Sequence, residues 1–193
     1  RTLGLGADPQ GLACGRVAVL PGPPPAGYTL VRVDRQQARR RSGAVPGPRT
    51  LTPPLVADTG GLLRALASGP GGGASFPEYE EALRSARSFV VPALVLAEVD
   101  YFLRSNRPAM RALVAEIFDP ATRYEYEPPL PVDVARALEL DARFRELKLG
   151  LVDGTVLAVA ERRRVFRILT TDRRDFGVVR IGPRLNRALE LLP

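Results

Sequence analysis

The sequence has no histidine and a single cysteine, Cys14, among its 193 residues. One cysteine excludes a disulfide within the chain, and the missing histidines exclude zinc sites built from cysteine and histidine. The serine–histidine and cysteine–histidine pairs of ordinary nucleophilic hydrolases are excluded for the same reason. Hydrolytic chemistry in this chain would therefore have to use other residue types.

Long apolar runs are also missing. No stretch approaches the roughly 18 uncharged apolar residues that a membrane-spanning helix needs. Proline and glycine interrupt every apolar stretch in residues 1–25, so we do not expect a signal peptide. With 45% hydrophobic residues and a mean hydropathy near zero, we expect a soluble, cytoplasmic protein with a packed core and no membrane association.

The net charge of +7 is placed unevenly along the chain. Residues 1–50 contain eight arginines against two aspartates, whereas residues 51–193 contain 20 basic and 19 acidic side chains. The basic excess therefore belongs to the leading segment. The high isoelectric point is not by itself evidence that the folded part binds nucleic acid.

Residues 1–50 are predicted to be a leader separate from the domain at 51–193. Clusters of proline and glycine at 21–27 and 45–50 break regular structure, although the alternating YTLVRV at 28–33 fits one short strand. The chain opens with arginine, and Met110 is its one methionine. Three interpretations stay open: a disordered basic tail, translated sequence upstream of the native start or left from a neighbouring partner, or an arm that binds nucleic acid.

From residue 51 onward, short apolar runs alternate with amphipathic segments. We predict strands at 53–57, 89–92, 123–130, 165–172 and 178–182, and helices at 59–69, 76–88, 93–105, 107–119, 132–147 and 152–164. Strands separated by long helical connections indicate an α/β fold, with a mainly parallel sheet of four to five strands and helices on both faces. Ligands in such folds bind outside the carboxyl ends of the strands.

Four acidic residues lie where predicted strands end or where the following helices begin. They are Asp58, Glu98, Asp153 and Asp172. Carboxylates that gather at one place repel one another and raise one another's pKa, so they do not gather for stability. A hard cation such as Mg²⁺ or Mn²⁺ is the simplest compensation, and a cation held by carboxylates supports phosphate chemistry. We therefore predict that the four are catalytic residues and metal ligands, with Asp58 and Asp153 nearest the metal.

Structural roles for the same residues stay open. Asp58 and Asp153 each fit the N-cap of a helix, and Asp172 fits the cap of the turn that follows it. Asp175 is an alternative to Asp172 as the fourth acidic residue, but its spacing fits the pattern less well. Glu98 lies in an otherwise apolar helix. A solvated helix face explains many glutamates.

Two further groups of charged residues bear on the site. Asp100 lies roughly 200° around the helix from Glu98, so we expect Asp100 to be exposed and Glu98 to face elsewhere. The arginines at 162–164 end a helix, where cations favour the helix dipole, and we expect them to be structural. Arg173 and Arg174 follow the fourth acidic position and are better candidates for phosphate contact.

Three segments resemble PIN-domain ribonucleases, and most closely the VapC-type toxins of bacterial toxin–antitoxin pairs. They are VADTGGLL from residue 56, LAEV from residue 96, and VDGTVLAVAERRRVFRILTTDRRDF from residue 152. The resemblance spans residues 54–181. It implies a small three-layer α/β/α sandwich and places Asp58, Glu98, Asp153 and Asp172 at the four acidic positions of the family.

The resemblance also implies an activity and partners. The chain would be a Mg²⁺- or Mn²⁺-dependent endoribonuclease that hydrolyses RNA, neutralised by a cognate antitoxin protein and acting as a homodimer. One position departs from the family pattern, because many relatives have serine or asparagine where this chain has Gly60. Thr59 is the neighbouring residue that would supply a polar contact instead.

Other functional classes are weighed against this interpretation. A phosphatase of the haloacid-dehalogenase type needs an acidic residue where Gly60 stands. A catalytically weak PIN-like module that binds RNA or protein is one alternative, and a nuclease directed at DNA through the same site is another.

Overall fold

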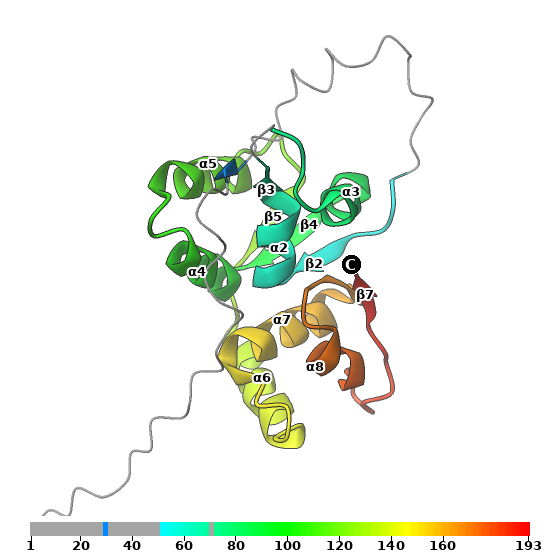
Figure 1. The fold of residues 1–193 in the computed structure, drawn as a ribbon. Coiled ribbons are helices and arrows are strands. Elements are labelled where there is room, and N and C mark those ends of the chain that lie inside the picture. The colour runs from blue at the N-terminus through cyan, green and yellow to red at the C-terminus, as the bar shows by residue number, and fades with distance from the viewer. Residues whose placement is uncertain (1–28, 31–50, 70–71) are drawn as a thin grey trace, which may run out of the picture.

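The computed structural model describes residues 29–30, 51–69 and 72–193 (Figure 1). Most of the predicted leader, 1–50, lies outside these residues. No helix of the described ranges is both long enough and apolar enough to cross a membrane.

A five-stranded sheet with the order β5-β4-β2-β6-β7 forms the centre of the fold. Its strands are β2 (Leu55–Ala57), β4 (Phe89–Pro92), β5 (Tyr124–Glu127), β6 (Arg167–Leu169) and β7 (Glu190–Leu192). Every neighbouring pair in this sheet is parallel. The central strands β2 and β4 are buried along their whole length, as expected for a parallel sheet that helices cover on both faces. The predicted fold class is confirmed.

Seven helices are present in the described residues. They are α2 (Thr59–Leu66), α3 (Pro77–Ser85), α4 (Ala93–Phe102), α5 (Arg107–Ile117), α6 (Pro131–Arg143), α7 (Gly150–Arg163) and α8 (Arg173–Val178). Proline stands in the first turn of α3, α5 and α6, where its missing N–H costs no hydrogen bond. The first six of these helices correspond to the six predicted from the sequence.

The order of the strands assigns the helices to two layers. The chain passes from β2 to β4 and on to β5, moving outward in one direction across the sheet. It then returns to β6 and moves outward to β7 in the other direction. Because such crossovers are right-handed, α2 to α5 cover one face and α6 to α8 cover the other, as Figure 1 shows.

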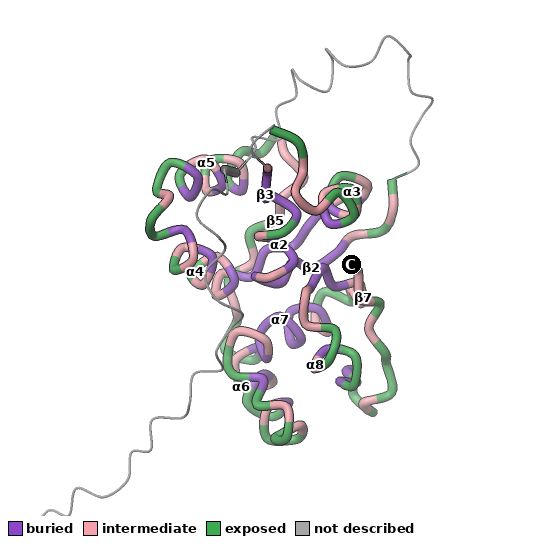
Figure 2. The backbone as a smooth tube through the Cα atoms, viewed as in Figure 1, coloured by how far each residue is buried: buried purple, intermediate pink, exposed green. Residues whose placement is uncertain are grey.

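Helix α7 is the most deeply enclosed of the described helices. Residues 154–160 are buried without interruption, so this helix has no solvent-facing stripe in its middle. Gly154 permits a close approach to α6, because a Cβ at this position would lie 2.9 Å from the Cβ of Ala137. Figure 2 shows this buried helix beside the buried strand β2. The middle of α7 is thereby packed closely against α6.

The helix predicted at 59–69 ends earlier than expected. Ala67–Ser68 forms the short strand β3, which pairs antiparallel with β1 (Thr29–Leu30). Ser75 reinforces this geometry, since its backbone N–H donates to the carbonyl of Ala67 at 2.9 Å. The strand predicted at 28–33 is found in part as β1, and its other residues lie outside the described ranges.

The strand predicted at 178–182 is wrong. Asp172 accepts a hydrogen bond from the backbone N–H of Asp175 and starts helix α8, so Val178 ends a helix instead of beginning a strand. Ile181 makes an isolated antiparallel bridge, and the chain then turns at Gly182, which has a φ of +91°. The last strand is β7, which pairs with β6.

Candidate acidic active site

The site lies at the carboxyl ends of strands β2 and β6, where the chain leaves the two strands toward opposite faces of the sheet. Strands β2 and β6 are adjacent and parallel, but the helices that follow them cover opposite faces of the sheet. Such a switch point leaves a crevice at the carboxyl ends of the strands. Asp58 follows β2, and Asp172 follows β6 after two threonines. The backbone N–H of Asp58 donates to the carbonyl of Leu169 at 3.0 Å, which ties the two strand ends together.

The other two acidic residues reach this edge from the two helical layers. Glu98 lies in α4, and its Oε2 accepts a hydrogen bond from the Thr59 hydroxyl at 2.6 Å. Asp153 lies in the first turn of α7 on the other face. The charges of the other three predicted residues all act on Asp153 and raise its pKa. The structure therefore brings the four predicted residues together, and we call this group the acidic rim.

Two threonine hydroxyls connect the members of the acidic rim. Thr59 donates to Glu98, and Thr170 donates to Oδ2 of Asp58 at 2.8 Å. Thr170 also accepts a hydrogen bond from the backbone N–H of Asp172 at 2.9 Å. These bonds join three of the four carboxylate-bearing segments into one network. Thr170 was not among the residues predicted from the sequence, because its bond to Asp58 joins positions 112 residues apart and no local pattern marks it.

Asp58 is buried, with 6% of its surface exposed. Burial and the charge of Glu98 act to raise its pKa, the hydrogen bond from Thr170 acts to lower it, and the net result is a pKa of about 6. The backbone N–H groups of Thr59 and Gly60 also act to lower this pKa, although the side chain makes no full capping hydrogen bond at the start of α2. Capping alone therefore does not account for a buried carboxylate at this position.

Asp153 has the most strongly shifted pKa of the acidic rim. Burial is the largest cause, and together with the charges of Asp58, Glu98, Asp172 and Asp175 it raises the pKa of Asp153 to about 8. Helix α7 begins at Gly150, so Asp153 lies inside the first turn and is not the N-cap. Its environment disfavours the ionised form, as expected for a carboxylate that shares a site with others.

Asp172 has a structural contact in addition to its place in the acidic rim. Its Oδ1 accepts the hydrogen bond from the Asp175 backbone at 2.9 Å that caps α8. The predicted capping role is thus present. Asp175 itself lies at the same edge, where burial and then the charge of Asp172 raise its pKa. The sequence analysis named Asp175 as the substitute acidic residue, and the structure places it beside the site.

A glycine fixes the distance between the start of α2 and the end of β6. A Cβ on Gly61 would lie 2.1 Å from the carbonyl oxygen of Leu169, so no side chain fits at this position. The close approach carries Asp58 and Thr59 against the segment that bears Thr170.

The donor set of the acidic rim suits a hard divalent cation. All of its candidate ligands are carboxylate oxygens, which Mg²⁺ and Mn²⁺ prefer. The raised pKa values of Asp58 and Asp153 indicate that these two carboxylates are electrostatically unfavourable without a cation. Within the described ranges, no three histidine, cysteine, aspartate or glutamate side chains lie together closely enough to hold a metal ion as a set.

The arginines that end α7 have a structural role, as predicted. Arg162 lies between two carboxylates, 2.8 Å from Asp133 and 2.8 Å from Glu127, and Arg163 pairs with Glu125 and Glu127. Although burial acts to raise the pKa of Asp133, hydrogen bonds from Arg162 and the backbone hold it below its ordinary value. These pairs tie α7 to the edge strand β5 and to the start of α6.

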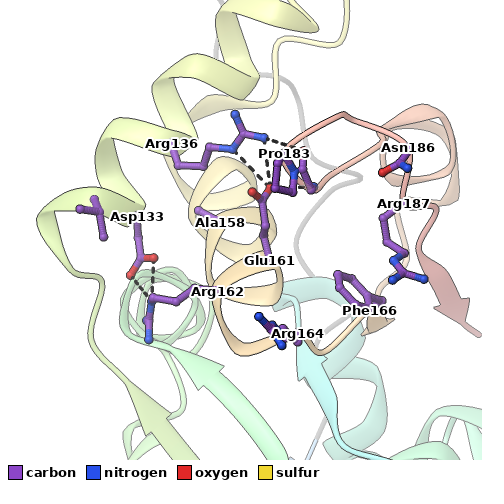
Figure 3. Close-up of a pocket in the computed structure, with 12 residues that line it drawn as sticks. Asp133, Arg136, Ala158, Glu161, Arg162, Arg164, Phe166, Pro183, Asn186 and Arg187 are labelled. Carbon is purple, nitrogen blue, oxygen red and sulfur yellow. Dashed lines mark hydrogen bonds and ion pairs between the residues drawn. The ribbon is translucent and has the colours of Figure 1, made fainter.

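A cavity of about 590 Å³ lies at this same end of α7 (Figure 3). Arg136 and Glu161 form an ion pair in its wall, and Glu161 also accepts a hydrogen bond from the backbone of Gly182 at 3.0 Å. The cavity lies near the beginning of β6, whereas the acidic rim lies beyond the end of that strand. It is therefore separate from the candidate active site.

Other predicted charged residues lie where the sequence placed them. Asp100 is of intermediate burial with its side chain 46% exposed, and it forms an ion pair with Arg107 at 2.5 Å. Arg173 and Arg174 are exposed at the start of α8, directly after the acidic rim.

The comparisons with known proteins match the region that contains the site. The family model described as "PIN domain" matches residues 55–181. Ribonuclease VapC26 of Mycobacterium tuberculosis is 27% identical over 128 residues, which cover 65% of this chain and 92% of the relative. The crystal structure of VapC20 of Mycobacterium tuberculosis, a toxin that cleaves the sarcin-ricin loop, superimposes with a TM-score of 0.51 at 23% identity. The superposition covers 64% of this chain and 93% of VapC20, and it supports the fold.

Proposed function

The chain belongs to the PIN domain family, and from that premise we propose that it is a divalent-metal-dependent endoribonuclease of the VapC type, which hydrolyses phosphodiester bonds in RNA. One observation carries the proposal. Four carboxylates from separate segments surround the switch point of the sheet, and two of them have pKa values raised to about 6 and about 8. Such a cluster is costly unless it binds a cation, and functional sites are where such costs are found.

A Mg²⁺ or Mn²⁺ ion bound at the acidic rim would make a water nucleophilic at neutral pH and neutralise charge on the scissile phosphate. We assign Asp58 and Asp153 to the ion directly, because their ionised forms are the most disfavoured without it. Glu98 and Asp172 would hold the waters around it.

The threonines position the carboxylates for this role. Thr170 fixes Oδ2 of the buried Asp58, and Thr59 fixes Oε2 of Glu98. Because each hydroxyl donates to one oxygen, the carboxylates are oriented before any ligand binds, so little reorganisation is needed when it does. Asp172 is oriented by its capping bond to α8.

Residues 51–193 form the nuclease domain in this proposal, and residues 1–50 are a leader outside it. The similarity to a curated ribonuclease VapC26 and to the fold of the toxin VapC20 supports RNA as the substrate. The name of VapC20 supports the role of a toxin. We further propose that a cognate antitoxin protein neutralises it and that it acts as a homodimer in the cytoplasm.

The direct test is cleavage of total RNA with Mg²⁺ or Mn²⁺ by the intact chain and by Asp58→Asn and Asp153→Asn. Each substitution keeps the shape of the side chain and removes its charge, so both variants should lose cleavage. Asp100→Asn is the matched control, because that acidic residue lies outside the acidic rim in an exposed ion pair. Undiminished cleavage in both rim variants would falsify the site. RNA binding without cleavage by the wild-type chain would favour the alternative of a weak PIN-like binding module.

A further inference from the structure

A side chain from the end of β6 occupies the space that Gly60 leaves open. A Cβ on Gly60 would lie 2.2 Å from Oγ1 of Thr171 and 3.2 Å from both of its side-chain carbons. Any larger residue at position 60 would therefore have to displace Thr171. Since Gly60 follows Asp58 by two residues and Thr171 directly precedes Asp172, the Thr171 hydroxyl lies between two segments of the acidic rim.

This hydroxyl differs from its two neighbours in its bonding. The hydroxyls of Thr59 and Thr170 each donate to a carboxylate of the rim. Throughout the described ranges, Thr171 makes no side-chain hydrogen bond, and its side chain is half-buried. A hydroxyl without a protein partner at the edge of a crevice retains a proton to donate to a ligand.

We infer that Thr171 positions the substrate by donating a hydrogen bond to a non-bridging oxygen of the phosphodiester. The inference rests on the proposed function and assigns a residue to it. The oxygens of a phosphodiester accept hydrogen bonds and donate none, and the same is true of the ionised carboxylates of the rim. A hydrogen-bond donor is therefore needed where the phosphodiester meets the rim. Gly60 is required for this placement, because a side chain there would occupy the position of the hydroxyl.

The alternative is that Thr171 only fills space beside Gly60. Valine and threonine have the same shape, so Thr171→Val keeps the packing and removes the donor. Serine keeps the donor and removes the methyl group. The two substitutions therefore separate the two roles, since a packing role predicts that valine is tolerated and a hydrogen-bonding role predicts that serine is tolerated.

The experiment measures kcat/KM for an RNA oligonucleotide that contains a cleavage position mapped with the wild-type chain. Thr171→Val should lower kcat/KM on the order of 10- to 100-fold, as expected for a lost hydrogen bond to a charged group, while Thr171→Ser should stay within about threefold of wild type. The melting temperatures of both variants should match that of the wild type, which shows that the fold is kept.

Binding gives a second readout that does not depend on turnover. In an Asp58→Asn background, which cannot cleave, the same labelled RNA is titrated and fluorescence anisotropy is followed. Adding Thr171→Val should weaken binding on the order of tenfold, whereas adding Thr171→Ser should leave it within about threefold.

A reciprocal pair tests whether the two positions share one space. Gly60→Ser alone should destabilise the protein, because its Cβ meets the Thr171 side chain. Thr171→Ala alone should lose activity. In the double variant Gly60→Ser/Thr171→Ala the collision is absent, so this variant should be more stable than Gly60→Ser. The introduced serine also supplies a hydroxyl from the α2 side of the same space, so the double variant should be more active than Thr171→Ala.

The outcomes separate this inference from the proposed function. If Thr171→Val keeps the wild-type kcat/KM and RNA affinity, the inference about Thr171 is overturned. If Asp58→Asn at the same time cleaves no RNA, the nuclease proposal still stands. Equal losses in Thr171→Val and Thr171→Ser would also overturn it, because the hydroxyl would then not be the determining group. A wild-type chain that cleaves no RNA would overturn both.

Discussion

Replacing Asp153 with asparagine is expected to stabilise the metal-free protein although it abolishes cleavage. Burial and the surrounding carboxylates raise the pKa of Asp153 from 3.8 to about 8. At neutral pH, this carboxyl must therefore either take up a proton on folding or remain ionised among like charges. Either alternative costs free energy of folding. Asparagine has the same shape and no charge, so the substitution removes that cost.

The size of the effect follows from the shift in pKa. Each pKa unit corresponds to about 1.4 kcal/mol, so the full shift sets a ceiling of several kcal/mol. Asp153 is only partly buried, and water and side-chain relaxation reduce the cost in the metal-free protein. We expect the free energy of unfolding to rise by about 1–2 kcal/mol at neutral pH, which for a domain of this size raises the melting temperature by about 3–6 °C.

Thermal unfolding in EDTA, followed by circular dichroism, measures this difference as a function of pH. Because the pKa of Asp153 is higher in the folded than in the unfolded state, its contribution to stability is greatest at or below pH 4 and is lost as the pH rises toward about 8. The stability of the wild type should therefore fall between about pH 5 and about pH 8, and the advantage of Asp153→Asn should grow over that range.

Asp100→Asn is the control for charge removal in general, because it changes an exposed ion pair and should give a small, pH-independent difference. A melting temperature of Asp153→Asn below that of the wild type at neutral pH would refute the electrostatic reasoning. So would a difference that stays constant from about pH 5 to about pH 8.

Three further predictions follow from other contacts. Thr170→Val removes the hydrogen bond to the buried Asp58, and it should lower stability by about 1–2 kcal/mol and reduce cleavage, as measured by urea unfolding and RNA cleavage. Gly61→Ala places a Cβ 2.1 Å from a backbone carbonyl that cannot move aside, so it should destabilise the protein by about 2 kcal/mol or more in the same unfolding assay, and a wild-type midpoint would contradict this. Asp133→Asn removes the buried negative charge to which Nε of Arg162 donates in the contact between α6 and α7, so it should lower stability by about 2–4 kcal/mol while the cleavage rate per folded molecule stays unchanged.

The sequence predicted most of the fold because its elements have strong local signals. The buried runs of β2 and β4 and the proline-started helices are specified by neighbouring residues, so their positions were predicted to within a few residues. The last strand was placed wrongly at 178–182, because the capping bond of Asp172 starts a helix and the turn at Gly182 moves the pairing segment to Glu190–Leu192.

The acidic rim was predicted because parallel strands end at one edge of a sheet, so acidic residues after different strands converge. The supporting contacts were not predicted. Thr170 bonds to a residue that is distant in the sequence, and the fit of Thr171 against Gly60 depends on the distance between two segments. Such contacts are properties of the packed structure, and no local pattern in a single sequence encodes them.

The proposed metal site requires that Asp58 and Asp153, whose pKa values are raised without a cation, lose their protons when a cation binds. Titration of the protein with Mn²⁺ at neutral pH, by calorimetry in two buffers of different ionisation enthalpy, measures binding and proton release together. The raised pKa values of Asp58 and Asp153 predict that Mn²⁺ binds with release of protons, and that Asp153→Asn reduces both the affinity and the release. Failure of Mn²⁺ to bind, or binding without proton release, would contradict the account.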